Sequence, residues 1–179
     1  ISDGGAAFII TTEDRAKELG IEKPLAYLWG MGQGYSHQYL TSLQDLNQIY
    51  NAVDHSGQKA FQTAGIGVKD VNMAYLYDCF TITVLLTLEG LGFVPKGDGG
   101  PFALEGRMGL GKDLPTNTNG GLLSQAHLGA MHHVVEATLQ LRGEAGQRQV
   151  EKNDVAVVHG NGGIVSAHST VVLGKEPLS

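Results

Sequence analysis

The sequence predicts an α/β fold in which a mixed, mainly parallel sheet carries helices on both faces. Apolar runs of strand length alternate with amphipathic helical patterns, many of the 26 glycines separate these patterns, and the last two runs follow each other closely. The alternation favours parallel strands, and the final pair is typical of an antiparallel hairpin. We therefore expect one domain over residues 1–179 with the order β-α-β-α-β-α-β-β.

The first third of the chain shows two strand patterns and one helix pattern. Residues 6–11 form an apolar run that predicts a buried strand, and Thr11 or Thr12 then provides a cap for a helix that ends at Gly20. Residues 25–29 predict the next strand. The glycine-rich stretch 30–34 lacks the G-x-G-x-x-G pattern of dinucleotide loops, and it is more typical of a flexible turn that leaves the sheet.

The remaining elements follow from periodicity and from glycine breaks. Residues 43–65 carry an apolar stripe at helical spacing, and residues 92–113 are glycine-rich with little periodicity, which indicates a long surface loop. The other predicted elements are a strand at 71–76, a buried helix at 81–91, a helix from Gly121 to Arg142, and strands at 155–158 and 164–173.

Three groups of residues follow strands in this order, and each is a candidate for a ligand site. In such sheets ligands bind at the carboxyl ends of the strands, where Tyr77, the Gly120–Gly121 pair and His159 are expected. His127 is expected near a helix start, where unpaired amides favour a developing negative charge and an imidazole suits proton transfer to a carbonyl compound. Asp78 is expected to cap the helix that begins near Thr81.

Four motifs in order give the chain a resemblance to the thiolase superfamily. Residues 117–124 read Asn-Thr-Asn-Gly-Gly-Leu-Leu-Ser and precede His127, which is similar to the signature of that superfamily's C-terminal half. Residues 2–7 resemble the start of that half. Residues 77–80, Tyr-Asp-Cys-Phe, resemble the His-Asp-Cys-Phe motif of sterol-carrier-protein thiolases. Residues 159–163 stand where the superfamily has a glycine-rich turn.

The resemblance implies roles for these residues. His127 would activate a cysteine nucleophile located in a preceding half that we expect to be missing, and Cys79 would shuttle protons. His159 and the amides following it would help to form an oxyanion hole. The residues implied for substrate or oxyanion binding are Asn161, Gly162, Gly163, Gly120 and Gly121. The chain would then be the C-terminal domain of an acyltransferase of the acetyl-CoA acetyltransferase type.

Departures from the family motifs leave two other functions open. Tyr77 replaces a histidine, Leu128 replaces a proline, and His159 replaces a cysteine. These changes resemble a branch of steroid side-chain retro-aldolases that use tyrosines as acid and base and need a small OB-fold, zinc-ribbon partner protein. The third hypothesis is a non-catalytic carrier or scaffold for a lipid-like ligand. Without any such role, Tyr77 would be an amphipathic residue at a strand end and Cys79 an inert core thiol.

Composition limits the remaining possibilities. The net charge of -6 and the absence of a Lys/Arg cluster argue against a nucleic-acid partner, and no apolar run predicts a membrane span. One cysteine excludes an internal disulfide and fits a reducing, cytoplasmic location. His127, His132 and His133 lack metal-ligand spacing, so we expect no metal and no cofactor beyond the coenzyme A thioester substrate. The resemblance implies a homodimer or larger assembly.

Overall fold

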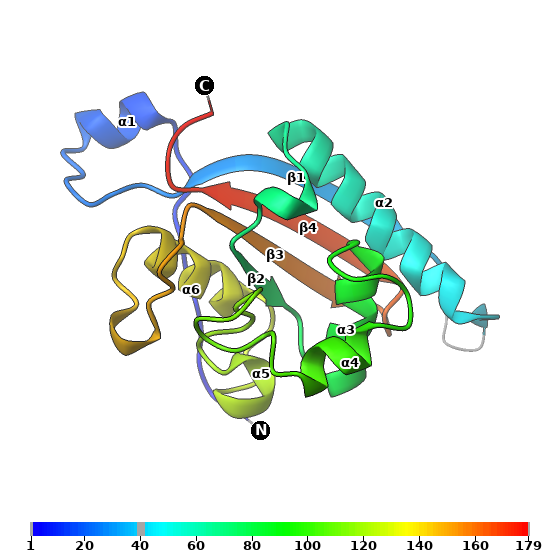
Figure 1. Ribbon diagram of the computed structural model, residues 1–179. Coiled ribbons are helices and arrows are strands. Elements are labelled where there is room, and N and C mark those ends of the chain that lie inside the picture. The colour runs from blue at the N-terminus through cyan, green and yellow to red at the C-terminus, as the bar shows by residue number, and fades with distance from the viewer. Residues whose placement is uncertain (1, 39–41, 179) are drawn as a thin grey trace.

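The computed structural model describes residues 2–38 and 42–178, which form one mixed sheet covered by helices. Within this part of the chain the sheet has the strand order β1-β4-β3-β2 (Figure 1). The strands are β1 (Tyr27–Tyr35), β2 (Met73–Leu76), β3 (Val155–Gly162) and β4 (Ala167–Gly174). Strands β2 and β3 are parallel, whereas β4 is antiparallel to both of its neighbours. The α/β class and the mixed sheet are confirmed, but the expectation of a mainly parallel sheet is corrected.

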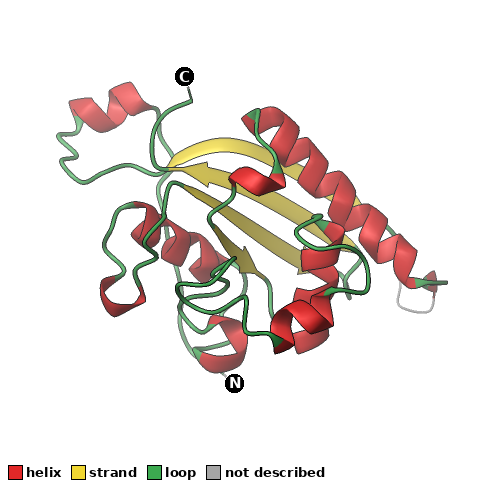
Figure 2. Ribbon diagram, in the orientation of Figure 1, coloured by secondary structure: helices red, strands yellow, loops and turns green. Residues whose placement is uncertain are grey.

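Helices lie on both faces of the sheet, as Figure 2 shows. Helices α2 (Leu46–Ala64) and α3 (Thr81–Gly90) cover one face, where their apolar side chains pack on Leu76 and Val157. Helix α6 (Met131–Leu141) covers the other face and packs on Tyr75. The shorter helices are α1 (Glu13–Glu18), α4 (Gly99–Leu104) and α5 (Gly121–Ser124), with 3₁₀ turns at Val68–Asp70 and Gly146–Arg148. Two apolar cores, one for each face, therefore hold the sheet in place.

The glycine-rich stretch 30–34 is part of β1 and not a flexible turn. Its three alternate glycines face α2, and a Cβ added at Gly30, Gly32 or Gly34 would meet a carbonyl oxygen of α2 at 2.2, 2.1 or 1.9 Å. Only a residue without a Cβ permits this approach. Figure 1 shows α2 lying along β1 as a result. Helix α2 begins at the cap residue Asp45 and ends at Gly65, whose φ is 68°.

Residues 6–11 do not form the predicted strand. They are extended and exposed, with Ile9 at 92% and Ile10 at 74%, because no sheet edge in the described part of the chain pairs with them. The helix that follows is confirmed as α1, and Thr12 Oγ1 accepts a hydrogen bond from Arg15 N over 3.3 Å. The apolar pattern alone therefore does not make this segment a strand.

The stretch 92–113 is more ordered than its composition predicts. It contains α4, whose Phe102 is buried in the core beneath α3. The amide of Gly99 donates to Glu89 Oε1 over 2.9 Å, which ties the start of α4 to α3. The predicted helix from Gly121 to Arg142 is interrupted at residues 125–130, so it is α5 followed by α6.

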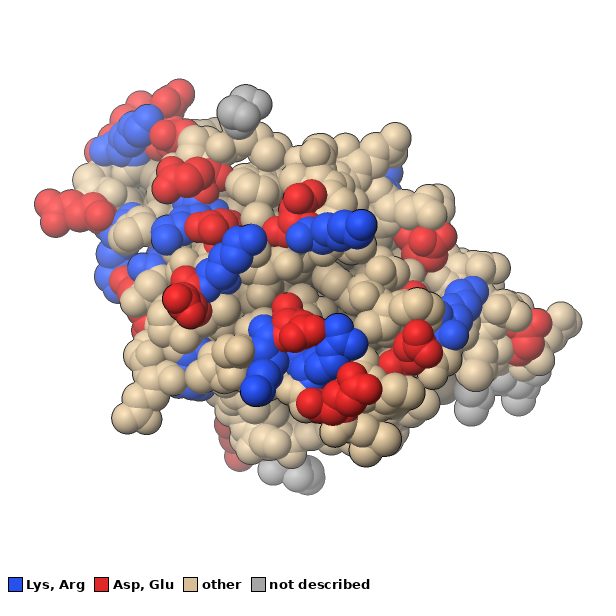
Figure 3. All heavy atoms as spheres, viewed as in Figure 1, with Lys and Arg blue, Asp and Glu red and all other residues tan. Residues whose placement is uncertain are grey.

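Charged side chains of both signs intermingle on the face of the molecule shown in Figure 3. Arg107 pairs with Asp113 at 2.6 Å, and Lys17 pairs with Glu13 at 2.7 Å. Pairs this exposed contribute little to stability. Among the described residues, no helix is both apolar and long enough to cross a lipid bilayer.

Candidate active site

A cleft of about 320 Å³ lies where the carboxyl ends of β2 and β3 meet. The two strands are parallel, and the amide of Tyr77 extends their ladder by donating to the carbonyl oxygen of His159 over 3.0 Å. The cleft is lined by Tyr77, Cys79, Phe80, Ile82, Thr83, Leu86, Asn161, Gly162, Ile164 and Val165. Two of the four predicted catalytic residues, Tyr77 and Cys79, therefore line one cavity.

The Tyr77 ring contacts the His127 ring. Their centroids are 6.1 Å apart, and their planes meet at 83°, an edge-to-face arrangement. His127 is exposed and lies in the 125–130 loop, not at the start of a helix as predicted. Burial, and after it the neighbouring Cys79 and Asp78, raise the pKa of the Tyr77 phenol above its ordinary value. The phenol therefore keeps its proton at neutral pH.

The Cys79 thiol is half-buried and lies among polar groups of the cleft. Its sulfur is 3.8 Å from Thr83 Oγ1 and 3.9 Å from Asn161 Oδ1. The Nδ2 atom of Asn161 is buried and has no hydrogen-bond partner among the described residues. A buried, unpaired amide N–H in a cleft suits a ligand oxygen. The side chain of Asn161, and not only its backbone amide, is thus a candidate oxyanion donor.

The His159 side chain does not line the cleft. Its ring is fully buried between β3 and α2, with Nδ1 2.9 Å from Thr170 Oγ1 and Nε2 3.1 Å from His168 Nδ1. Burial, with a smaller effect of His168, lowers the pKa of His159 to about 3. The predicted turn at 159–163 is also corrected, because residues 159–162 continue β3 opposite β4. Of the predicted oxyanion residues, Asn161 and Gly162 line the cleft and Gly163 begins the turn after it.

The Gly120–Gly121 pair holds a protein carboxylate. Both glycines have positive φ, 94° and 61°, and a Cβ on Gly121 would lie 2.2 Å from Asp78 Oδ2. Asp78 accepts hydrogen bonds from the amides of Leu122 at 2.8 Å and Leu123 at 3.3 Å. Asp78 therefore caps α5. The prediction that it caps the helix beginning near Thr81 is wrong. The amides that follow Gly121 are occupied by this side chain.

Asp78 also faces a buried histidine that sequence reasoning missed. His133 Nε2 lies 3.4 Å from Asp78 Oδ1, and both side chains are almost completely buried. Burial raises the pKa of Asp78, but the facing His133 and the hydrogen bonds from the amides of Leu122 and Leu123 outweigh it, so the net shift is downward. Only the fold reveals this pair, because the two residues come from different segments of the chain.

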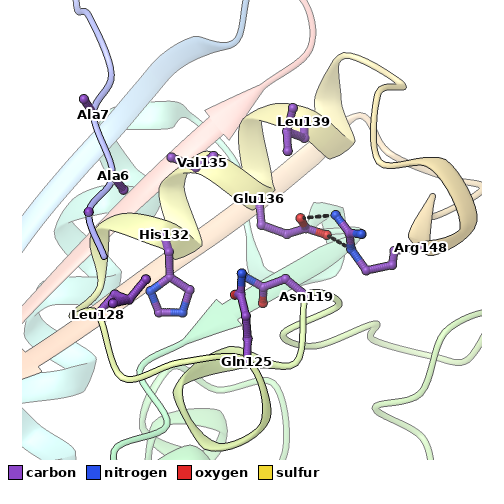
Figure 4. Close-up of a pocket in the computed structure, with 11 residues that line it drawn as sticks. Ala6, Ala7, Asn119, Gln125, Leu128, His132, Val135, Glu136, Leu139 and Arg148 are labelled. Carbon is purple, nitrogen blue, oxygen red and sulfur yellow. Dashed lines mark hydrogen bonds and ion pairs between the residues drawn. The ribbon is translucent and has the colours of Figure 1, made fainter. Parts of the chain in front are cut away.

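A second cavity, of about 610 Å³, lies between α6 and the extended segment 5–7. Figure 4 shows His132 and Glu136 on α6 facing it, with Glu136 held by two hydrogen bonds from Arg148 at 2.9 and 3.1 Å. In the described part of the chain, no three His, Cys, Asp or Glu side chains gather closely enough to hold a metal ion.

Together, the fold and the cleft define an α/β domain with a candidate acid–base site at the carboxyl ends of its parallel strands. A family model described as thiolase C-terminal domain-like matches residues 32–175. The chain belongs to this family.

Relatives in this family have different activities. The chain is 36% identical to an acetyl-CoA acetyltransferase of Methanothermobacter thermautotrophicus over 94% of its own length and 45% of the relative's. It is 34% identical to a steroid side-chain-cleaving aldolase of Thermomonospora curvata, over 90% and 41%. Among solved structures, the Ltp2-ChsH2(DUF35) aldolase matches with a TM-score of 0.77 and 29% identity, over 90% and 42%. The chain therefore spans less than half the length of these relatives.

Proposed function

We propose that this chain is the C-terminal half of an enzyme that makes or breaks a carbon–carbon bond beside a coenzyme A thioester. The observation that carries the proposal is that Tyr77 lines a cleft together with Cys79 and Asn161, while its ring contacts the ring of His127. Such chemistry needs a proton donor or acceptor and a polar donor for the thioester oxygen. The phenol and imidazole supply the first requirement, and the unpaired amide of Asn161 supplies the second.

Among reactions of this class, the phenol favours aldol cleavage of a β-hydroxyacyl-CoA. The β-hydroxyl loses its proton, the bond between the α and β carbons breaks, and its electron pair forms the thioester enolate. A proton then returns to the α carbon, which leaves a carbonyl product and a shorter acyl-CoA. A phenol with a raised pKa suits exchange of a proton with an alkoxide, with His127 as the adjacent base. No covalent acyl-enzyme is needed.

Acyl transfer of the acetyl-CoA acetyltransferase type is the second candidate. It is favoured by Cys79, a thiol in the cleft that would move protons while a cysteine elsewhere in a longer protein takes the acyl group. His127 would activate that second cysteine. The reaction would convert a β-ketoacyl-CoA and free coenzyme A into two acyl-CoA products, which distinguishes it from aldol cleavage.

The test uses the protein encoded by the longest reading frame that contains this chain. We expect it to cleave a β-hydroxyacyl-CoA without added coenzyme A, and we expect Tyr77→Phe to lower that rate by at least about 100-fold because a general acid–base group is lost. Chromatography of the CoA esters measures both. Tyr27→Phe is the matched control, because Tyr27 pairs with Gly174 at the opposite edge of the sheet.

Each outcome of this assay has a definite meaning. Undiminished cleavage by Tyr77→Phe would remove the phenol from the mechanism. Conversion of a β-ketoacyl-CoA only when coenzyme A is present would favour acyl transfer. Binding of CoA esters without turnover, unaffected by His127→Ala, would favour a carrier.

We also propose that the activity needs other protein chains. The matching solved aldolase contains both Ltp2 and ChsH2, so a small partner protein of that kind is expected for aldol cleavage here. A homodimer or larger assembly is proposed from the family resemblance. Activity that appears only after a candidate partner is co-expressed would support this part of the proposal.

A further inference from the structure

A buried chain of hydrogen bonds connects α2 to the turn after β3. Ser56 Oγ lies 2.8 Å from Thr170 Oγ1, which lies 2.9 Å from His159 Nδ1. His159 Nε2 lies 3.1 Å from His168 Nδ1, and His168 Nε2 lies 2.9 Å from the carbonyl oxygen of Val165. We call the side chains of Ser56, Thr170, His159 and His168 the buried relay; all four residues are buried.

At each end, the buried relay contacts a backbone carbonyl oxygen, which accepts hydrogen bonds and cannot donate them. At one end, Ser56 Oγ donates to the carbonyl oxygen of Val53 over 2.8 Å. At the other end, the carbonyl oxygen of Val165 requires an N–H from His168. Two hydroxyls and two neutral imidazoles bring four protons, whereas the five contacts need one each. One proton must therefore be shared.

The direction of the relay follows from the neutrality of its imidazoles. Burial is the main cause that lowers the pKa of His159 to about 3, and it also lowers the pKa of His168. A neutral His168 that donates from Nε2 must accept at Nδ1, so His159 also donates from Nε2. His159 Nδ1 then accepts from Thr170. The shared proton is that of Ser56, which serves both Thr170 and Val53.

The turn at which the relay ends is strained and lines the cleft. Ile164 and Val165 have φ values of 59° and 55°, a left-handed conformation that is rare for β-branched residues. Such strain persists only where the surroundings hold it. The four carbonyl groups of residues 163–166 accept hydrogen bonds from Ser166 Oγ, His37 Nε2, His168 Nε2 and Ser36 N, in that order. Both strained residues form part of the cleft wall that also contains Tyr77.

We propose that His168 is a positioning residue: oriented by His159 and the hydroxyls beyond it, it holds Ile164 and Val165 as the wall of the cleft that contacts the hydrocarbon part of an acyl substrate. The part concerning the substrate rests on the proposed function of the cleft. The part concerning the turn rests on geometry alone, so the two can fail separately.

The first test reads the tautomers directly, in the protein from the longest reading frame with ¹⁵N-labelled histidine. We expect NMR to show both His159 and His168 as neutral Nε2–H tautomers. Thr170→Val removes the hydroxyl at nearly constant shape and should shift the ring-nitrogen signals of His159, whereas Thr170→Ser should retain them. An Nδ1–H tautomer at His168, or signals that Thr170→Val leaves unchanged, would overturn the proposal.

The second test measures the turn. His168→Leu removes the donor to Val165, whereas His168→Gln can restore it with its amide. We expect hydrogen exchange in a peptide spanning residues 162–167 to become about five- to ten-fold faster in His168→Leu, because the part-buried hydrogen bond to the Val165 carbonyl is lost. His168→Gln should stay close to wild type. Equal exchange in all three proteins would overturn the proposal, and if the Leu variant does not fold, the tautomer test decides.

The third test distinguishes a role of Ile164 and Val165 in substrate binding from a role in catalysis. In His168→Leu we expect KM for the acyl-CoA to rise about five-fold with kcat within two-fold, because the wall binds substrate without reacting. His168→Gln should recover most of the lost affinity. A fall in kcat with unchanged KM would overturn the assigned role in substrate contact. If no acyl-CoA is turned over by the wild-type protein, the proposed function fails, while the tautomer and exchange results still decide the positioning role.

Discussion

Asp78 shows how one side chain can organise the surroundings of a catalytic candidate. It stands between Tyr77 and Cys79 in sequence, but its carboxylate turns inward to the amides that follow Gly121 and to His133. The carboxylate thereby ties the end of β2 to α5 and to α6, and the segment between these two helices carries His127. The ring contact of Tyr77 with His127 therefore depends on a residue that does not line the cleft.

Replacing Asp78 by Asn should destabilise the protein by about 2–3 kcal/mol at neutral pH, because an amide cannot accept from both backbone N–H groups and face His133 as well. Chemical denaturation at several pH values measures this. Asp54→Asn is the control, since Asp54 is exposed and bonds only Gln58 among the described residues.

The difference in stability between wild type and Asp78→Asn should depend on pH in a definite direction. The pKa of Asp78 is lowered from its ordinary value of 3.8, so its contribution is complete above that value and is lost as the pH falls through the folded-state pKa. The stability gap between wild type and Asp78→Asn should therefore narrow below about pH 4. A gap that widens in acid would contradict the assigned role.

Among the elements, β1 and α2 pack with their backbones in direct contact. The alternate glycines of β1 bring the two backbones together, and this approach allows Ser56 on α2 to reach Thr170 on β4. The packing of this pair of elements thus sets the geometry of the buried relay.

Gly32→Ala should destabilise the protein by about 3 kcal/mol, because its methyl group would lie 2.1 Å from the Ser56 carbonyl oxygen and the helix would have to move away. Gly100→Ala is the matched control: its Cβ meets nothing within 4 Å, so its effect should be small. Thermal unfolding of both variants measures the difference, and equal melting temperatures would contradict the packing argument.

The sequence predicts the elements that local patterns of residues mark. It misses the features that depend on packing or pairing with other elements of the chain. The helix at 43–65 and the strand at 71–76 were predicted because apolar periodicity and flanking glycines mark them. Residues 30–34 were misassigned because three glycines in five residues also describe a turn, and only α2 explains them. Residues 6–11 have the pattern of a strand but are exposed, and they pair with no strand of the part of the chain that the structure describes.

The candidate site was predicted in part for the same reason. Tyr77 and Cys79 follow a strand end that can be located from the sequence, and the structure places both in the cleft. The end of β3 could not be located, because pairing with β4 extends it into the glycine-rich stretch and turns His159 inward. The unpaired amide of Asn161 and the partner of Asp78 required the tertiary fold.

At the scale of the whole molecule, the described residues leave apolar side chains of segment 6–11 exposed. Ile9 and Ile10 are exposed, and the cavity beside segment 5–7 is bounded by α6. The relatives are about twice as long as this chain. These observations agree with the proposal that the active cleft needs further chain to be complete.

The 179-residue chain on its own should not turn over acetoacetyl-CoA or a β-hydroxyacyl-CoA. Its one cysteine cannot serve both as nucleophile and as proton shuttle, and the chain spans less than half the length of the relatives it matches. The comparison is with the protein from the longest reading frame, at equal molar concentration and in the same assay. Turnover by the short chain at a rate comparable to that of the longer protein would refute the proposal of a half-enzyme.

The packing of Gly30, Gly32 and Gly34 of β1 directly against α2 has a mechanical consequence. Where side chains separate a helix from a sheet, small rotamer changes can absorb a displacement, but here carbonyl oxygens abut the strand with nothing adjustable between them. Helix α2 and β1 should consequently move as one rigid body. A displacement of one of these two elements would therefore be transmitted to the other.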